Sequence, residues 1–340
     1  MTDTMNSMAG GAGRAAVGIL KKFAIVLVLL GLILFFAALT PYFFTVENLT
    51  NIFVQQSYVI IAAVGLSFVM IGGGMDLSIG YQMSLVGVST AAFMKWYGIP
   101  LPLSLIMGLL LGVALGLFNG IAAIKLKVHT LIITLGTMTV FQGLSYIVSR
   151  QSVILNLPPA FKFIGQGYVF GFVPFSVILM MVTVAFASFI LNKTYLGRYI
   201  YAIGGNEEAT RLAGVDVVKV KLIIFTICGF FTAVSSIVLF ARSGSAASST
   251  GPGTEFSCMT AAVLGGISFK GGEGKMWGLL TGVLILGVLG NGMQLIGMGT
   301  YSQYIVKGFV LLAAVGFDTY QKSVKTAKRH SPVATLAAAK

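Results

Sequence analysis

Long apolar runs separated by short polar stretches are the feature that most constrains the fold of this chain. A helix needs about 20 consecutive apolar residues to cross the hydrocarbon core of a bilayer. The runs occupy residues 23–39, 52–71, 77–97, 101–124, 129–149, 170–192, 221–241, 256–268, 276–297 and 301–319. They predict an all-α polytopic membrane protein with about ten transmembrane segments. The eighth run is too short to span the bilayer unaided, so we expect a broken or half-helix there.

The balance of residue types agrees with lipid as the solvent. Of the 340 residues, 57% are hydrophobic and 9% are charged, whereas a soluble domain carries about 25% charged residues. The net charge of +13 raises the question of nucleic-acid binding. However, the basic residues form short clusters between apolar runs, which is typical of cytoplasmic loops. We therefore expect no nucleic-acid partner.

The positions of the basic residues predict the orientation. With the N-terminus inside and ten crossings, 17 of the 22 lysines and arginines lie in inner segments, so both termini are predicted to be cytoplasmic. The four on the outer side are Lys95, Arg150, Lys162 and Arg242. Lys307 falls within the last helix, and we expect it to reach the inner interface. Residues 1–19 and 321–340 are then flexible N-terminal and C-terminal tails around a transmembrane domain, residues 20–320.

A faint internal repeat relates the two halves of the chain. Residues 117–120 (LFNG) resemble residues 289–292 (LGNG) at an offset of 172 residues. The copies are five crossings apart, so they would have inverted topology, as in many transporters with a pathway at the repeat interface. A chance match in a glycine-rich chain remains the alternative.

The longest polar stretch between apolar runs is the loop 193–221. In this loop Asn206 is placed to cap a short helix, with Glu207 and Glu208 in its first turn, where the helix dipole favours acids. Gly214 stands where such a helix would end. Two interpretations stay open: a solvated helix that only connects its neighbours, or a docking helix for a cytoplasmic partner.

Separate motifs resemble one family, in the order expected for it. Residues 208–214 (EATRLAG) look like the E-A-A-x-x-x-G coupling motif of ABC importer permeases, with Thr at the third position. Residues 197–214, 73–80 (GGMDLSIG), 261–268 (AAVLGGIS) and 271–275 (GGEGK) resemble the inner-membrane permeases of ribose-type and galactose-type ABC importers. The resemblance runs from about residue 45 to 320 and is closest to the ribose type.

The resemblance implies a permease subunit that translocates a monosaccharide, ribose or a related sugar, across the bacterial cytoplasmic (inner) membrane. It implies a homodimer in the lipid bilayer, a cytoplasmic ABC ATPase and a periplasmic or lipid-anchored sugar-binding protein. The chain lacks G-x-x-x-x-G-K-[ST], so ATP and Mg would be bound by the ATPase and this chain would need no cofactor. The residues expected to couple to the ATPase are Asn206, Glu207, Glu208, Ala209, Arg211 and Gly214.

Four polar residues in or beside apolar runs are candidates for a pathway or gate: Asp76, Asn119, Asn291 and Gln294. An acid inside lipid costs about 2.5–3.5 kcal/mol on insertion scales, so Asp76 either caps a helix beginning at Leu77 at the cytoplasmic edge or faces a cavity. We favour the cap, and a direct role with a sugar or proton stays open. The three amides either bond between helices or line a polar path.

Two glycine-rich loops have two interpretations each. Residues 243–255 form either a flexible outer linker, or a contact for the binding protein or a mobile gate. Residues 269–275 form either a tight turn or a second surface near the ATPase.

Two other classes of protein remain as rivals. An ion-coupled secondary transporter of a small polar solute needs carboxylates in its path, and only Asp76 and Asp318 lie near one, both at edges. A membrane-embedded enzyme needs a nucleophile with a base or a metal cluster, and we find no such catalytic set and no metal-ligand spacing.

Overall fold

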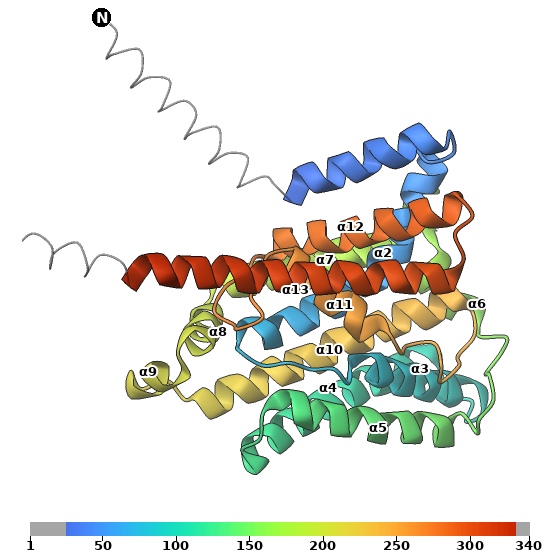
Figure 1. The fold of residues 1–340 in the computed structure, drawn as a ribbon. Coiled ribbons are helices and arrows are strands. Elements are labelled where there is room, and N and C mark those ends of the chain that lie inside the picture. Colours follow the sequence, from blue (N-terminus) through green and yellow to red (C-terminus); the bar gives the residue numbers. More distant parts are fainter. Residues whose placement is uncertain (1–24, 331–340) are drawn as a thin grey trace, which may run out of the picture.

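The computed structural model describes residues 25–330. They form a helical bundle with one small β-hairpin (Figure 1). The first helix is Ile25–Leu39. The elements that follow are α2 (Val46–Ile71), α3 (Ile79–Lys95), α4 (Leu101–Leu126), α5 (Thr130–Val148), α6 (Pro159–Gln166), β1 (Tyr168–Val169), β2 (Val173–Pro174), α7 (Phe175–Lys193), α8 (Tyr195–Gly205), α9 (Glu207–Leu212), α10 (Val217–Ser243), α11 (Thr254–Leu264), α12 (Met276–Leu295) and α13 (Thr300–His330). The tail predicted for residues 1–19, and residues 331–340 of the other predicted tail, lie outside the described residues.

Six helices in this part of the chain are long and apolar enough to cross a membrane: α2, α4, α5, α7, α10 and α12. The helix Ile25–Leu39 is apolar but shorter. The protein is therefore a multi-pass helical membrane protein, as the apolar runs predict.

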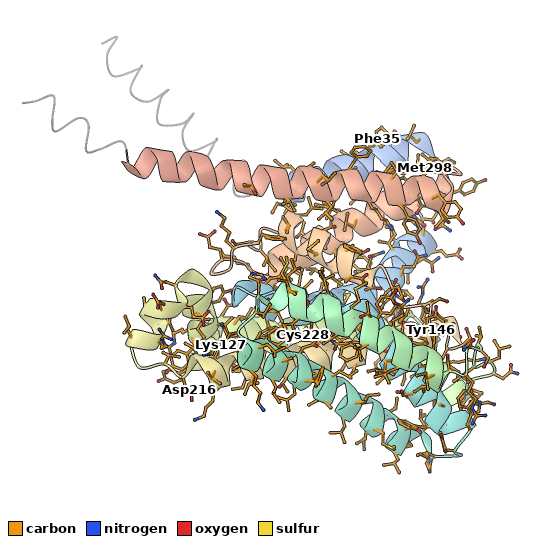
Figure 2. All side chains as sticks on the ribbon, turned by 60° about the horizontal axis from the view of Figure 1, so that its bottom comes forward. Phe35, Lys127, Tyr146, Asp216, Cys228 and Met298 are labelled. Atoms are coloured by element: carbon orange, nitrogen blue, oxygen red, sulfur yellow. The ribbon has the colours of Figure 1, made fainter. Side chains whose placement is uncertain are left out.

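The bundle has two distinct ends. Its helices run roughly parallel, with α8 and α9 extending beyond one end and α6 lying at the other (Figure 1). Lys127 and Asp216 lie toward the α8–α9 end and Tyr146 and Met298 toward the opposite end, with Cys228 between them (Figure 2). We call these the α9 end and the opposite end.

The centre of the bundle is built from α2 and α10, which are the most buried of the six long helices. On α10, Gly229 lies against Gly112 and Gly116 of α4. Lipid supplies no hydrophobic force between helices, so close packing of small residues is what holds such helices together.

Two short helices begin inside the bundle, where their N-terminal ends meet. The first, α11, has 11 residues, in agreement with the predicted half-helix. The other, α3, has 17 residues and follows a non-helical stretch, residues 74–78, where the sequence predicted a helix from residue 77. The N–H of Gly251, before α11, donates to Ser84 Oγ on α3 at 3.2 Å. A side chain on Gly80 would overlap Glu255.

Other boundaries also differ from the predicted ones. The antiparallel hairpin pairs Tyr168 with Pro174 and Val169 with Val173, so the segment predicted to begin at residue 170 begins as a helix at Phe175. The last predicted segment, 301–319, is part of a longer helix that ends at His330. Polar and glycine-rich flanks explain both differences, since apolar runs locate the centre of a helix better than its ends.

Candidate functional site

The polar unit at the α9 end consists of α8 and α9, separated only by Asn206 (Figure 1). Asn206 caps α9, because its Oδ1 accepts the backbone N–H of Ala209 at 2.9 Å. Glu207 and Glu208 stand in the first turn of this helix. The capped helix predicted from the sequence is therefore confirmed. The preceding helix α8 was missed, since its short tyrosine- and glycine-containing stretch was assigned to the loop.

The C-terminal end of α9 depends on Gly214. This residue has φ of +85°, and its N–H donates to the carbonyl oxygen of Arg211 at 3.0 Å. The next N–H, of Val215, donates to the Thr210 carbonyl oxygen at 3.3 Å. Glycine adopts positive φ without the strain that a Cβ brings, which is why it follows helix ends so often.

The side chains of α9 present a mixed surface to solvent. Glu208 and Arg211 form an ion pair at 3.2 Å, and Glu207 pairs with Lys221 of α10 at 2.7 Å. Such surface pairs contribute only about 0–1 kcal/mol each, so they orient side chains more than they stabilise the fold. Between them Ala209 is exposed, and so is Leu212, one turn further on, whose relative accessibility is 86%. Leu212 was not singled out in the sequence, because an apolar residue in a short polar helix has no motif that marks it.

A buried hydrogen-bond network brings together Asp76 and Asn119. The Asp76 side chain is fully buried. Its Oδ1 accepts the backbone N–H of Ser78 at 2.9 Å and the Ser78 hydroxyl at 2.6 Å, and its Oδ2 accepts the Gln82 amide at 3.2 Å. The Asn119 amide donates to Asp76 Oδ2 at 3.3 Å and to Ser78 Oγ at 2.8 Å. Each donor lowers the free energy of the buried carboxylate.

The prediction that Asp76 caps a helix beginning at Leu77 is wrong. The helix begins at Ile79, and its N-cap Ser78 makes no side-chain cap bond. Asp76 instead accepts the N–H of Ser78, before the first turn, and lies inside the bundle rather than at its edge. The partial positive charge of the α3 N-terminus still favours a carboxylate at this position.

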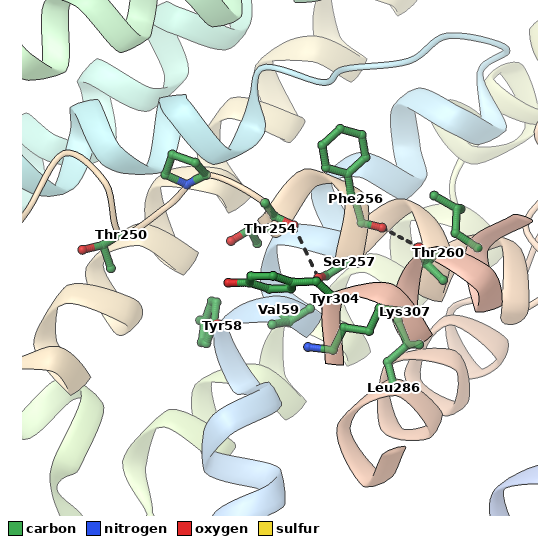
Figure 3. A pocket seen from close by; sticks show the side chains of 14 residues that line it. Tyr58, Val59, Thr250, Thr254, Phe256, Ser257, Thr260, Leu286, Tyr304 and Lys307 are labelled. Atoms are coloured by element: carbon green, nitrogen blue, oxygen red, sulfur yellow. Dashed lines mark hydrogen bonds between the residues drawn. The ribbon is translucent and has the colours of Figure 1, made fainter. Parts of the chain in front are cut away.

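A cavity of about 710 Å³ lies among α2, α11, α12, α13 and the stretch before α11 (Figure 3). Its size falls within the range of about 300–1,000 Å³ that ligand pockets occupy. The hydroxyl-bearing side chains that line it are Tyr58, Thr250, Thr254, Ser257, Thr260 and Tyr304. Figure 3 shows Tyr58, Ser257 and Tyr304 grouped close to one another. Hydroxyl groups both donate and accept hydrogen bonds, so this wall suits a polar ligand.

A second hollow, of about 180 Å³, shares Tyr58, Ser257 and Lys307 with the first. Its remaining polar lining comes from Gln55, Gln56, Arg242, Asn291, Gln294 and Gln303. The candidates Asn291 and Gln294 therefore lie at one hollow, separate from the network of Asp76 and Asn119. Among the described residues, neither hollow is lined by an acidic side chain.

Lys307 corrects one expectation. It lines both hollows together with residues of the opposite end, including Arg242 and Gln303. The helix α13 begins beside Met298, which Figure 2 places at that opposite end. The prediction that Lys307 reaches the interface on the side of the coupling loop is therefore wrong. The sequence showed only a lysine in an apolar run and not the direction of its side chain.

The loop 243–255 is not a loose linker. Ala246 exchanges backbone hydrogen bonds with Ile154, both at 2.9 Å, and the Ser248 hydroxyl donates to the Ser145 carbonyl oxygen at 2.9 Å. The loop then supplies Thr250 and Gly253 to the cavity wall. The loop 269–275 lies against α8, because the Tyr201 hydroxyl donates to the Gly274 carbonyl oxygen at 2.7 Å.

Comparison with known proteins gives a consistent result. The family described as "Branched-chain amino acid transport system / permease component" matches residues 48–315. The ribose import permease protein RbsC of Haemophilus influenzae is 38% identical over 88% of this chain and 93% of its own length. The L-arabinose transport system permease protein AraH of Escherichia coli is 38% identical over 85% and 88%. The xylose transport system permease protein XylH of Haemophilus influenzae is 32% identical over 82% and 91%. No solved structure matches the chain.

These matches confirm the resemblance drawn from the motifs. The family match includes the network of Asp76, helix α9 and most of the cavity wall. The chain belongs to the family of permease components of bacterial transport systems described for branched-chain amino acids, in which its similarity is to sugar permeases.

Proposed function

We propose that this chain is the transmembrane permease subunit of an ATP-driven ABC importer, and that it translocates a monosaccharide, ribose or a related sugar. The similar proteins are named as permeases for ribose, arabinose and xylose. These sugars are similar in size and carry similar sets of hydroxyl groups. The proposal therefore specifies the class of sugar and favours ribose within it.

The observation that carries the proposal is the chemistry of the cavity. Hydroxyls from several helices line the larger hollow, which is big enough for a monosaccharide, and amides line the adjoining smaller one. Neutral groups of these kinds recognise sugar hydroxyls by hydrogen bonds. Chemical selection by this wall is expected to be weak, since a soluble binding protein would select the sugar before delivery.

We further propose ten crossings in two inverted repeats, with the α9 end in the cytoplasm. The offset of 172 residues seen in the sequence carries α2 onto residues 218–243, and α10 occupies Val217–Ser243. It carries α4 onto residues 273–298, where α12 occupies Met276–Leu295. The broken helices α3 and α11 are then partners that point in opposite directions from their meeting point.

The partners follow from this arrangement. A second copy of the chain would complete the pathway, and a cytoplasmic ATPase, which binds ATP and Mg, would dock on α9. The residues proposed to couple are Asn206, Glu207, Glu208, Ala209, Arg211 and Gly214. Closure of the ATPase would rock the two permease chains between outward-open and inward-open states.

Uptake by membrane vesicles tests the proposal. The permease is produced together with an ABC ATPase and a sugar-binding protein from the same bacterium, and uptake of radiolabelled ribose is measured with unlabelled ribose, arabinose or xylose as competitors. We expect saturable uptake that ribose suppresses best. Uptake that none of these sugars suppresses would contradict the proposed substrate class.

The alternative function is an ion-coupled secondary transporter of a small polar solute. Asp76 is the specific residue that favours this alternative, since it is a buried carboxylate inside the bundle. Four hydrogen-bond donors already surround it, however, and no acidic side chain of the described residues lines either hollow. The other buried carboxylate in the described part of the bundle, Glu255, lies against Gly80 and accepts the N–H of Gly253. Uptake that survives removal of ATP and collapses with an uncoupler would support the alternative.

A further inference from the structure

At the α9 end, three backbone segments approach each other with no side chain between them. The segments are the stretch after α2, the last turn of α8, and the loop between α11 and α12. Their contact is made by four glycines, which we call the glycine junction: Gly73, Gly204, Gly271 and Gly272. The coupling motif and the cavity do not include these residues.

The three segments pack backbone against backbone at Gly204, Gly271 and Gly272. The N–H of Gly272 donates to the carbonyl oxygen of Ile71 at 2.8 Å. A Cβ added to Gly204 would overlap that same oxygen and the Gly272 nitrogen, and one added to Gly271 would lie 2.7 Å from the Cα of Gly73. Protein interiors that are packed this closely transmit displacement instead of absorbing it. A shift of α8 must therefore move the end of α2 and the loop together.

Tyr201 adds a hydrogen bond to the contact between α8 and the loop 269–275. It stands one turn before Gly204, and its hydroxyl donates to the carbonyl oxygen of Gly274 at 2.7 Å. The loop is closed on itself, because the N–H of Ser268 donates to the Glu273 carbonyl oxygen at 2.9 Å. A closed loop held by a hydrogen bond and by close backbone packing moves with α8 as one piece.

The helices α11 and α12, on either side of the loop, connect the glycine junction to the larger cavity. On one side α11 contributes Ser257 and Thr260 to the cavity wall, and on the other α12 contributes Leu286. Only Asn206 separates α8 from α9. Elements in direct contact thus connect α9, through α8 and the glycine junction, to α11 and α12.

The glycine junction is also connected to the buried hydrogen-bond network of Asp76. After Gly73 the chain is held to α5, because the N–H of Met75 donates to Thr130 Oγ1 at 2.8 Å and that of Leu77 donates to Thr134 Oγ1 at 3.2 Å. Asp76 stands between these two anchored residues. The same junction therefore also reaches the start of α3.

We propose that the glycine junction and Tyr201 are positioning elements that convert a displacement of α9 into a change in the cavity wall. This inference rests on the proposed function, since it requires an ATPase that acts on α9. Neither Tyr201 nor the junction glycines line the two hollows.

The experiment uses the complete importer in proteoliposomes and compares two neighbouring substitutions. Gly204→Ala places a methyl group in the junction, whereas a Cβ on Gly205 meets nothing within 4 Å, so Gly205→Ala is the matched control. Radiolabelled ribose transported per ATP hydrolysed is one readout. The other is thiol labelling of a cysteine introduced by Ser257→Cys, with Cys228→Ala and Cys258→Ala in the same chain, in the presence and absence of ATP.

We expect Gly204→Ala to lower ribose transported per ATP by about fivefold or more, the lower end of coupling between two sites. It should also abolish the ATP-dependent change in labelling, while Gly205→Ala keeps both. An assembled Gly204→Ala complex with the wild-type ratio and labelling change would overturn the proposal.

Tyr201→Phe tests the proposal if the Gly204→Ala permease does not assemble into the importer complex. It removes only the hydroxyl and should lower the ratio by about two- to tenfold, as the loss of one hydrogen bond allows. An unchanged ratio and labelling change for Tyr201→Phe would then reject the proposal. Failure of the wild-type complex to move ribose is a different result, which rejects the proposed function.

Discussion

The side-chain amides of Asn48 and Asn291 bond to each other in both directions, at 3.0 and 2.9 Å. This pair joins the start of α2 to the last turns of α12 beside the smaller hollow. Because a buried amide without a partner pays the cost of lost hydration, the two residues depend on each other.

Asn48→Ala is expected to destabilise the protein by about 1–3 kcal/mol, the cost of leaving the buried amide of Asn291 unpaired. The double substitution Asn48→Ala and Asn291→Ala should cost less than the sum of the two single ones, since neither amide is then left alone. Thermal unfolding in detergent measures all three. Additive effects would show that the pair does not contribute as a unit.

Asp76→Asn replaces an acceptor of several hydrogen bonds by a group that also donates. Hydrogen bonds to charged groups contribute about 1.5–3 kcal/mol each, so we expect a clear loss of thermal stability. Asp216→Asn is the control, since Asp216 is exposed and caps α10 through one bond to the N–H of Lys219 at 3.0 Å. Equal effects of the two substitutions would contradict the role assigned to the buried network.

Glu208→Lys removes the ion pair with Arg211 and places a second positive charge beside it on the exposed face of α9. We expect binding of the ATPase to weaken by about tenfold, equivalent to about 1.4 kcal/mol, without a change in thermal stability. Lys95→Glu is a control that alters one exposed charge at the opposite end. Normal assembly and normal uptake with Glu208→Lys would show that α9 is not the docking helix.

Ser257→Phe fills part of the larger cavity. We expect sugar uptake to fall by about tenfold or more, since a rise of 1.36 kcal/mol in a barrier already has that effect. Assembly with the ATPase should be unchanged, because the residue lies away from α9. Thr139→Phe, on the exposed side of α5, supplies a bulky control, and equal losses from the two substitutions would argue against passage through the cavity.

Local features of the structure were predictable from the sequence, and contacts between distant segments were not. Asn206 and Gly214 mark the ends of α9 because capping depends on residues only a few positions apart. Asp76 and Asn119 lie 43 positions apart, and no local pattern indicates that their side chains meet. The helix α8 was missed for a similar reason, since its glycines reduce helix propensity. Close packing explains two of them, because Gly197 lies against the end of α7 and Gly204 against Ile71 and Gly272.

The direction in which a side chain points also could not be predicted from the sequence. Lys307 was identified as an unusual residue, but its position on α13 was compatible with either end of the bundle. The glycines of the junction show the same limit. The sequence contains many glycines, and only the fold shows which of them lie against another backbone.

We propose that ATP acting at the α9 end drives a sugar through the cavity from the opposite end. This is tested by the accumulation of radiolabelled ribose in sealed proteoliposomes that contain the ATPase, with ATP only in the lumen and the binding protein only outside. We expect accumulation against a gradient that requires both additions and is insensitive to an uncoupler. Accumulation without ATP that an uncoupler abolishes would contradict it.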